Sequence, residues 1–93
     1  MPKQPLVWNR KGDAYYQLGR YEEAIDIANK ALSIDPDSVE AYTNKAHALE
    51  KVGTIDETLE YYDKALEINP NIIDIWLSKA NALKDYERFD EAL

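Results

Sequence analysis

The sequence repeats itself with a period of 34 residues, and this period constrains the fold more than any local pattern does. When residues 5–38 are aligned with 39–72 without gaps, nine positions are identical, including Pro36 and Pro70. A repeat of this length is typical of proteins in which similar units stack and bury a shared core. The predicted units are an N-terminal extension at 1–4, a first repeat at 5–38, a second repeat at 39–72 and a truncated third repeat at 73–93.

Each unit is predicted to form a helix, a turn and a second helix. In the first unit Trp8, Gly12 and Tyr15 share one helical face, and a second stripe of apolar residues follows Gly19. Gly19 and Gly53 are predicted to end the first helices at positive φ, where glycine meets no steric cost. The prolines near the end of each unit lack the N–H that would continue a helix. The sequence therefore predicts an all-α protein.

Helix starts and core aromatics can also be assigned from local patterns. Ser38 is predicted to cap the helix that follows it, and Thr54 with Glu57 has the spacing of a capping box. Trp8 and Trp76 stand at equivalent positions of their units. Because aromatic residues at helical spacing mostly pack inside a protein, both tryptophans are predicted to be core residues.

The repeat resembles the tetratricopeptide repeat. The matching residues are Trp8, Gly12, Tyr15, Ala24, Ala31 and Pro36; Tyr42, Ala46, Leu49, Tyr62, Ala65 and Pro70; and Trp76, Ala80, Leu83 and Ala92. The resemblance covers residues 5–93 and implies a right-handed α-solenoid of helix-turn-helix repeats. It also implies that the first helix of each unit lines a concave groove, which binds an extended peptide or a partner helix. Glu87 departs from the pattern, because it stands where the other two units have glycine.

Composition disfavours several other functions. The net charge of -7 argues against nucleic acid and anionic membranes as partners, because lysine and arginine collect phosphates. No apolar stretch exceeds three residues, so we expect no membrane span and a cytoplasmic protein. The chain has no cysteine and one histidine. His47 and Glu50 together are too few ligands for a metal, and we therefore predict no cofactor, no metal site and no enzymatic activity.

The face opposite Trp8 and Gly12 is predicted to line the groove. The predicted groove residues are Asn9, Asp13, Tyr16 and Gln17 in the first unit; Glu40, Thr43, Asn44, His47, Glu50 and Lys51 in the second; and Asp74, Leu77, Ser78, Asn81, Lys84 and Asp85 in the third. Five of these residues are acids and two are lysines, which gives a net charge of -3. We therefore expect a peptide that is basic, or mixed basic and apolar. The alternative is that the stripe merely samples an acidic protein.

Some tetratricopeptide repeat proteins hold the C-terminal carboxylate of heat-shock chaperones in a clamp of lysine, asparagine and arginine. At the matching positions this sequence has Asn9, Asp13, Asn44, Asp74 and Ser78. Only Asn44 fits the clamp, and the two aspartates would repel a carboxylate. The sequence therefore predicts no binding of a chaperone tail.

The third unit suggests an alternative function, which is self-association. A residue other than glycine in the left-handed conformation costs about 1–2 kcal/mol, so Glu87 favours a helix that continues from Ile75 towards Leu93. Such a helix would carry apolar residues away from its own chain and onto another copy, as a domain swap or a stack. The residues predicted to make this contact are Tyr86, Phe89, Ala92 and Leu93. A closed homodimer is the preferred form.

Overall fold

The computed structural model describes the backbone of residues 5–92 and the side chains of residues 7–87. Within this range the chain forms five α-helices and no strand. The helices are α1 (Pro5–Gln17), α2 (Tyr21–Ile34), α3 (Val39–Val52), α4 (Ile55–Ile68) and α5 (Ile73–Ala92). The prediction of an all-α repeat fold is confirmed.

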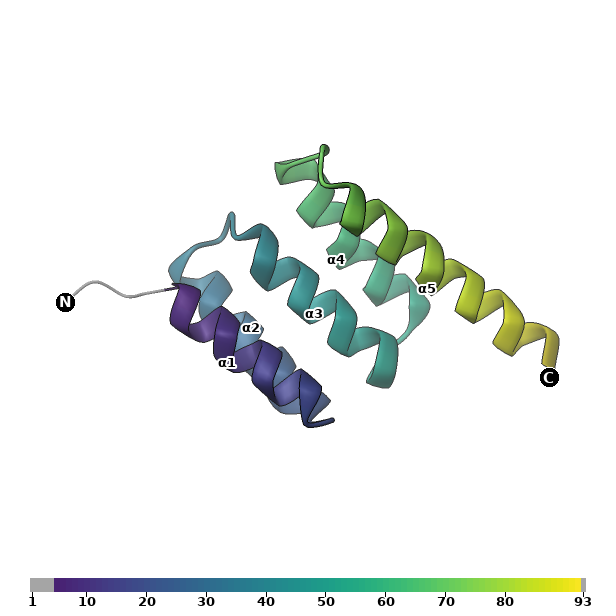
Figure 1. The fold of residues 1–93 in the computed structure, drawn as a ribbon, viewed down its shortest axis with the longest axis horizontal. Helices are drawn as coiled ribbons and strands as arrows, with labels where there is room; N and C mark the ends of the chain where they lie inside the picture. Colours follow the sequence, from purple (N-terminus) through teal and green to yellow (C-terminus); the bar gives the residue numbers. More distant parts are fainter. Residues whose placement is uncertain (1–4, 93) are drawn as a thin grey trace.

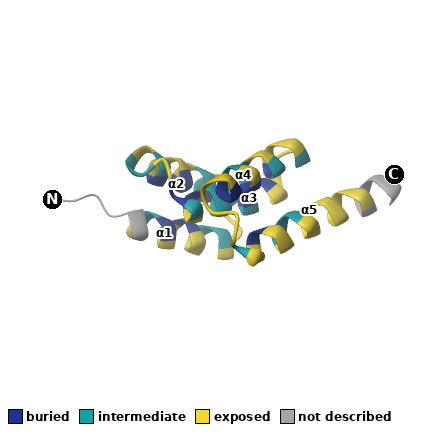
Figure 2. Cartoon of the chain, turned by 90° about the horizontal axis from the view of Figure 1, so that it is seen from above, coloured by how far each residue is buried: buried dark blue, intermediate teal, exposed yellow. Residues whose placement is uncertain are grey.

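The helices stack side by side along the long axis of the molecule (Figure 1). The extents of the molecule along its three principal axes are 51, 29 and 17 Å. Short turns join α1 to α2 and α3 to α4, so each pair is a helical hairpin. Seen from above, α2 and α4 lie on one side of the molecule while α1 and α5 lie on the other (Figure 2). Helices α1 and α5, the first helices of the outer units, therefore share one side of the solenoid, and α3 lies between the two sides (Figure 2).

The turn glycines differ from each other, and one prediction about them is wrong. Gly19 has a φ of 80°, which confirms the left-handed conformation expected there. Gly53 has a φ of -111°, so it does not adopt that conformation. Its need for glycine is spatial, because a Cβ atom on Gly53 would lie 2.8 Å from Cδ2 of Leu49.

Both predicted helix caps are confirmed. The Ser38 side chain accepts a hydrogen bond from the Ala41 N–H at 3.1 Å and begins α3. Thr54 and Glu57 form a capping box, in which Thr54 Oγ1 accepts from the Glu57 N–H at 3.2 Å and Glu57 Oε1 accepts from the Thr54 N–H at 3.3 Å. These bonds satisfy N–H groups that have no partner within the first turn of a helix.

Small residues let the helices of a hairpin approach closely. Ala46 and Ala65 have no exposed surface, and they pack around Tyr62, a large side chain that is also fully buried. In the first hairpin, a Cβ atom on Gly12 would lie 3.4 Å from Cγ2 of Ile27, so α1 and α2 are already in contact there. The core thus combines a few large side chains with many alanines.

The third unit is one uninterrupted helix. Helix α5 continues through Glu87, as predicted, although Leu93 and the side chains of Phe89 and Ala92 lie outside the described residues. The prediction that Trp76 is a core residue is wrong, because 49% of its surface is exposed. Within residues 5–92 no second helix follows α5 to cover this face, whereas Trp8 on α1 is partly covered.

Candidate functional site

Two adjacent hollows lie along the first helices of the units. The first hollow has a volume of about 320 Å³ and is lined by Asp13, Tyr16, Gln17, Asn44, His47, Glu50, Tyr62, Ser78 and Asn81. The second hollow has a volume of about 360 Å³ and is lined by Asn9, Arg10, Asp13, Glu40 and Asn44. The two hollows share Asp13 and Asn44 and therefore form one groove.

Ten of the sixteen predicted groove residues line these hollows. The other six are among the described residues but line neither hollow: Thr43, Lys51, Asp74, Leu77, Lys84 and Asp85. Thr43 instead donates its hydroxyl to the Val39 carbonyl of its own helix at 2.8 Å. The structure thus brings the middle of the predicted stripe together and leaves out much of the third unit.

A row of aromatic rings connects three helices within the first hollow. The ring centroids of Tyr16 on α1 and His47 on α3 are 5.9 Å apart. The His47 ring meets Tyr62 of α4 edge to face at 5.6 Å. Tyr62 then donates its hydroxyl to Glu50 Oε1 at 3.1 Å. This chain of contacts holds the rings and the Glu50 carboxylate in place.

Burial shifts the pKa values of the groups in this row. It lowers the pKa of His47 below its usual value, with Asp13 acting in the opposite direction, so the imidazole is neutral at pH 7. Loss of water raises the pKa of the Glu50 carboxyl, and the hydrogen bond from Tyr62 partly offsets this. Burial also raises the pKa of the Tyr16 phenol. Glu50 is nevertheless an exposed residue, so its carboxylate has lost only part of its water.

Asn9 connects the first two units rather than pointing freely into the groove. Only 7% of its surface is exposed, and its Nδ2 lies 3.5 Å from the Ser38 hydroxyl. The Asn44 side chain donates to the Asn9 carbonyl oxygen at 3.3 Å. No group in the described part of the chain donates to Asn9 Oδ1. Asn9 and Asn44 thus tie α1 to α3 beneath the second hollow.

Sequence reasoning misses two of the lining residues. The repeat pattern assigns Tyr62 to the core, and it is buried, but its hydroxyl also orients Glu50. No local signal links these residues, because they lie on different helices. Arg10 adds a positive charge to the second hollow. Its helical neighbour Asp13, three residues further on, is the one signal that could have placed Arg10 near the groove.

Of the residues predicted for self-association, Tyr86 is the one whose side chain the structure describes. Tyr86 is half exposed and lines a third hollow of about 550 Å³, which lies between α5 and the turn that joins α3 to α4 and shares Glu50 with the first hollow. Other apolar side chains around this hollow are Leu49, Ile55 and Ala82. The side chains of Phe89 and Ala92, together with Leu93, lie outside the described residues.

The described residues also bear on metal binding and on membranes. Among them, no cluster of three or more histidine, aspartate or glutamate side chains is placed to hold a metal ion. None of the helices in this part of the chain combines the length and the apolar character needed to cross a bilayer.

Comparison with known proteins relates this chain to proteins built from the same repeat. Three models of the tetratricopeptide repeat match residues 12–53, 39–72 and 61–93. The small glutamine-rich tetratricopeptide repeat-containing protein 2 of Mycosarcoma maydis is 36% identical over 46 residues, which are 50% of this chain and 13% of that protein. The RNA polymerase II-associated protein 3 of Homo sapiens is 39% identical over 44 residues, which are 47% of this chain and 7% of that protein. The chain thus matches only about a tenth of the length of these curated relatives.

Solved structures show the same arrangement of helices. The first TPR of Spaghetti (RPAP3), bound to the HSP90 peptide SRMEEVD, superposes with a TM-score of 0.84 and 25% identity, over 98% of this chain and 74% of that one. A thermophilic TPR protein of Thermus thermophilus superposes with a TM-score of 0.77 and 30% identity, over 88% of this chain and 42% of that one. The three matching repeat models together span residues 12–93, and the chain therefore belongs to the tetratricopeptide repeat family.

Proposed function

We propose that this chain is a protein-interaction scaffold that binds a peptide or helix of a partner protein in its groove. The observation that carries the proposal is the groove itself, which runs over α1, α3 and α5 and is lined by residues from all three units. The peptide bound to the first TPR of Spaghetti supports this mode of binding for a similar fold. No catalytic role is proposed for these residues.

We propose further that the bound peptide is basic, or mixed basic and apolar. The lining of the two hollows includes the carboxylates of Asp13, Glu40 and Glu50 and one guanidinium, that of Arg10. A concave surface lined by one sign of charge attracts ligands of the opposite sign and speeds their association. The acidity of the lining therefore favours a basic partner.

The same charges argue against an acidic chaperone tail. Asp13 would repel a terminal carboxylate. Asn9 is buried, so its side chain is not available as a clamp residue. Ser78 lines the first hollow with a neutral hydroxyl where an arginine is needed. The proposed groove chemistry is thus opposite to that required by the HSP90 peptide bound to the Spaghetti domain.

Fluorescence anisotropy with labelled peptides tests these proposals. We expect a basic peptide with two arginines and a leucine to bind saturably, and the peptide SRMEEVD to show no specific binding. Raising the salt concentration to about 0.15 M should weaken binding, because charges are then screened beyond about 8 Å. Salt-independent binding of SRMEEVD in the groove, with no binding of the basic peptide, would contradict the proposal.

A gain-of-function variant provides the matching control. Replacing Asp13 by Asn, Asp74 by Lys and Ser78 by Arg should introduce carboxylate binding, since it removes two negative charges and adds two cations. Asn9→Lys completes the clamp, but it should also destabilise the fold because Asn9 is buried between units. The variant with three substitutions is therefore the first to be compared with the unmodified chain for binding of SRMEEVD. If the unmodified chain already binds SRMEEVD through its carboxylate, the assignment of the groove face is wrong.

Self-association is a second candidate function, and it is favoured by the exposed face of α5. Trp76 and Leu83 are 49% and 38% exposed, and Tyr86 borders the hollow beside α4. A second copy that covered these side chains would bury apolar surface worth about 25 cal/mol per Å². Light scattering over a range of concentrations should then reveal a dimer, which Glu87→Gly and truncation after Asp85 should weaken. A monomer at high concentration that neither change affects would end this hypothesis.

A further inference from the structure

We propose that the first hollow is a specificity pocket for a single arginine side chain of the bound peptide. In this arrangement the guanidinium lies between the carboxylates of Asp13 and Glu50, and against the rings of Tyr16 and His47. The inference rests on the proposed peptide-binding function and names the chemical group that the groove selects.

The size and construction of the hollow fit one side chain. Its volume of about 320 Å³ is at the lower end of the range of about 300–1,000 Å³ that is usual for ligand pockets. Four helices contribute to its lining, with Tyr16 from α1, His47 from α3, Tyr62 from α4 and Asn81 from α5. The hollow is therefore formed by the packing of all three units and not by the surface of one helix.

The charges of the lining favour a cation. Among the side chains described, at residues 7–87, no lysine or arginine lines the first hollow, whereas Asp13 and Glu50 do. His47 adds no positive charge near neutral pH, because burial lowers its pKa. The second hollow differs, since Arg10 belongs to its lining. A basic side chain should therefore prefer the first hollow to the second.

The state of Glu50 strengthens this preference. Loss of water raises the pKa of its carboxyl group, and Asp85 nearby acts in the same direction while Lys51 opposes it. An ionised carboxylate that has lost part of its hydration gains more from an approaching cation than a fully hydrated one. A carboxylate has about four lone-pair sites, so Glu50 can accept a guanidinium N–H while it still accepts from the Tyr62 hydroxyl.

The polar and aromatic groups of the hollow favour arginine over lysine. A guanidinium is planar, carries five N–H donors and stacks on aromatic rings, whereas an ammonium is a compact, strongly hydrated charge. The rings of Tyr16, His47 and Tyr62 are held by mutual contacts at 5.9 and 5.6 Å. The lining also includes Gln17, Asn44, Asn81 and Ser78, whose side-chain oxygens are able to accept hydrogen bonds. Several hydrogen-bond acceptors around the hollow match the several N–H donors of a guanidinium better than they match a compact ammonium group.

The test uses three acetylated and amidated peptides: Gly-Gly-Arg-Gly-Gly, the same peptide with citrulline, and the same peptide with lysine. Citrulline keeps the shape of arginine without its charge. Titrations followed by the protein's backbone amide NMR signals should show saturable binding of the arginine peptide, with shifts at Gln17, His47 and Asn81. Because hydrogen bonds between charged groups contribute about 1.5–3 kcal/mol, the citrulline peptide should bind at least about tenfold more weakly. The lysine peptide should bind with intermediate affinity.

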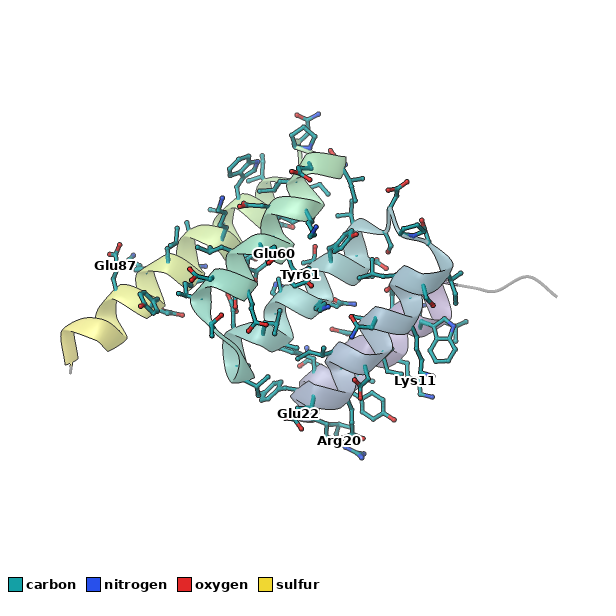
Figure 3. All side chains as sticks on the ribbon, turned by 180° about the vertical axis from the view of Figure 1, so that it is seen from behind. Lys11, Arg20, Glu22, Glu60, Tyr61 and Glu87 are labelled. Atoms are coloured by element: carbon teal, nitrogen blue, oxygen red, sulfur yellow. The ribbon has the colours of Figure 1, made fainter. Side chains whose placement is uncertain are left out.

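Paired variants locate the binding site. Asp13→Asn and Glu50→Gln should each lower the affinity for the arginine peptide by about tenfold. The amide oxygen introduced by Glu50→Gln can still accept a hydrogen bond from the Tyr62 hydroxyl. Glu22→Gln and Glu60→Gln remove the same charge from exposed acids on α2 and α4, which are labelled in Figure 3, and should change affinity by less than about twofold.

Three results would overturn the inference. They are equal affinity for the citrulline peptide, equal affinity for the lysine peptide, and unchanged affinity in both Asp13→Asn and Glu50→Gln. The arginine peptide could instead shift the amide NMR signals around Arg10 and Glu40 and bind both variants as tightly as the parent protein. That result would support peptide binding in the groove but contradict the arginine pocket. If no basic peptide binds anywhere on α1, α3 or α5, both proposals fall.

Discussion

The second and third units place equivalent residues in opposite environments. Ala46 and Leu49 on α3 are 0% and 7% exposed, because α4 packs over them. Their counterparts on α5, Ala80 and Leu83, are exposed, and within residues 5–92 no second helix follows α5. One sequence pattern thus gives a core in one unit and a surface in the other. The pattern specifies a face that can be buried, and the partner helix decides whether burial occurs.

The aromatic residue near the start of each first helix shows the same contrast. Tyr42 of α3 stacks on Tyr61 of α4, with ring centroids 6.1 Å apart, and Lys45 lies 4.2 Å above the Tyr61 ring. Trp76 of α5 instead donates its indole N–H to the Pro70 carbonyl at 2.9 Å and remains half exposed. In the third unit the aromatic residue packs on its own loop.

The largest expected effect comes from removing the buried aromatic ring of the second unit. Tyr62→Ala should lower the free energy of unfolding by about 3–5 kcal/mol, because it leaves a cavity among Ala46, Ala65 and Leu66. Trp76→Ala on α5 should cost less than about 1 kcal/mol, because its side chain is half exposed. Urea denaturation followed by circular dichroism measures both values. Equal costs would mean that α5 is covered in solution.

Enlarging the small residue at the centre of each first helix should have the next largest effect. Ala46→Leu should destabilise the protein by about 1–3 kcal/mol, because the added carbon atoms cannot fit against α4 without displacing it. Ala80→Leu should change stability by no more than about 0.5 kcal/mol, because Ala80 is exposed. Thermal melts of the two variants make the comparison. A large loss of stability in Ala80→Leu would contradict the contrast between the two units.

Substitutions at the turn position should differ in stability cost between the first and third units, by a smaller amount than the substitutions above. Gly19→Ala should cost about 1–2 kcal/mol, because alanine is strained at the φ of 80° observed there. Glu87→Ala should cost nothing, since residue 87 lies inside helix α5 and alanine is a good helix former. Measured free energies of unfolding should therefore be lower for Gly19→Ala than for Glu87→Ala. A cost at Glu87 similar to that at Gly19 would indicate a turn in α5.

The smallest effect concerns the pH dependence of stability. Burial lowers the pKa of His47 in the folded protein, so its stabilising contribution is complete above the unfolded value of about 6.5 and is lost as the pH falls through the folded pKa. His47→Gln should therefore lose less stability than the parent protein between neutral and mildly acidic pH. Glu50 acts in the opposite sense, because its raised pKa favours the folded form at lower pH, but both proteins retain it. Parallel pH profiles for the two proteins would contradict the prediction.

Much of the fold could be predicted because the 34-residue period specifies helices, turns and their order. The caps at Ser38 and Thr54 were predictable for a related reason, since each depends on residues close in sequence. Helical spacing also identified ten residues that line the two hollows. These features depend on local chemistry or on repetition, and both are visible in the sequence.

Other features depend on contacts between helices, and sequence patterns do not predict them. Helical spacing places Asn9 in the groove, and Asn9 does line the second hollow, but the spacing does not predict its burial or its contact with Ser38 in the turn before α3. The hydrogen bond between Tyr62 and Glu50 joins two helices, so neither residue signals it alone. The expectation of a buried Trp76 fails because the pattern assumes a covering helix. At Gly53 the expected positive φ is absent, and the two atoms nearest to an added Cβ are Cδ2 and the carbonyl oxygen of Leu49, at 2.8 and 3.1 Å.

Amide hydrogen exchange, measured with and without the arginine peptide, tests the central claim that the groove over α1, α3 and α5 is the binding surface. In the free protein we expect the slowest exchange in α3 and α4 around Ala46 and Tyr62, and faster exchange in α5 beyond Ala82. Peptide should slow exchange in α1, in α3 and in α5 around Ser78, because it contacts all three helices. Slowing confined to α2 and α4, or none at all with saturating peptide, would contradict the account.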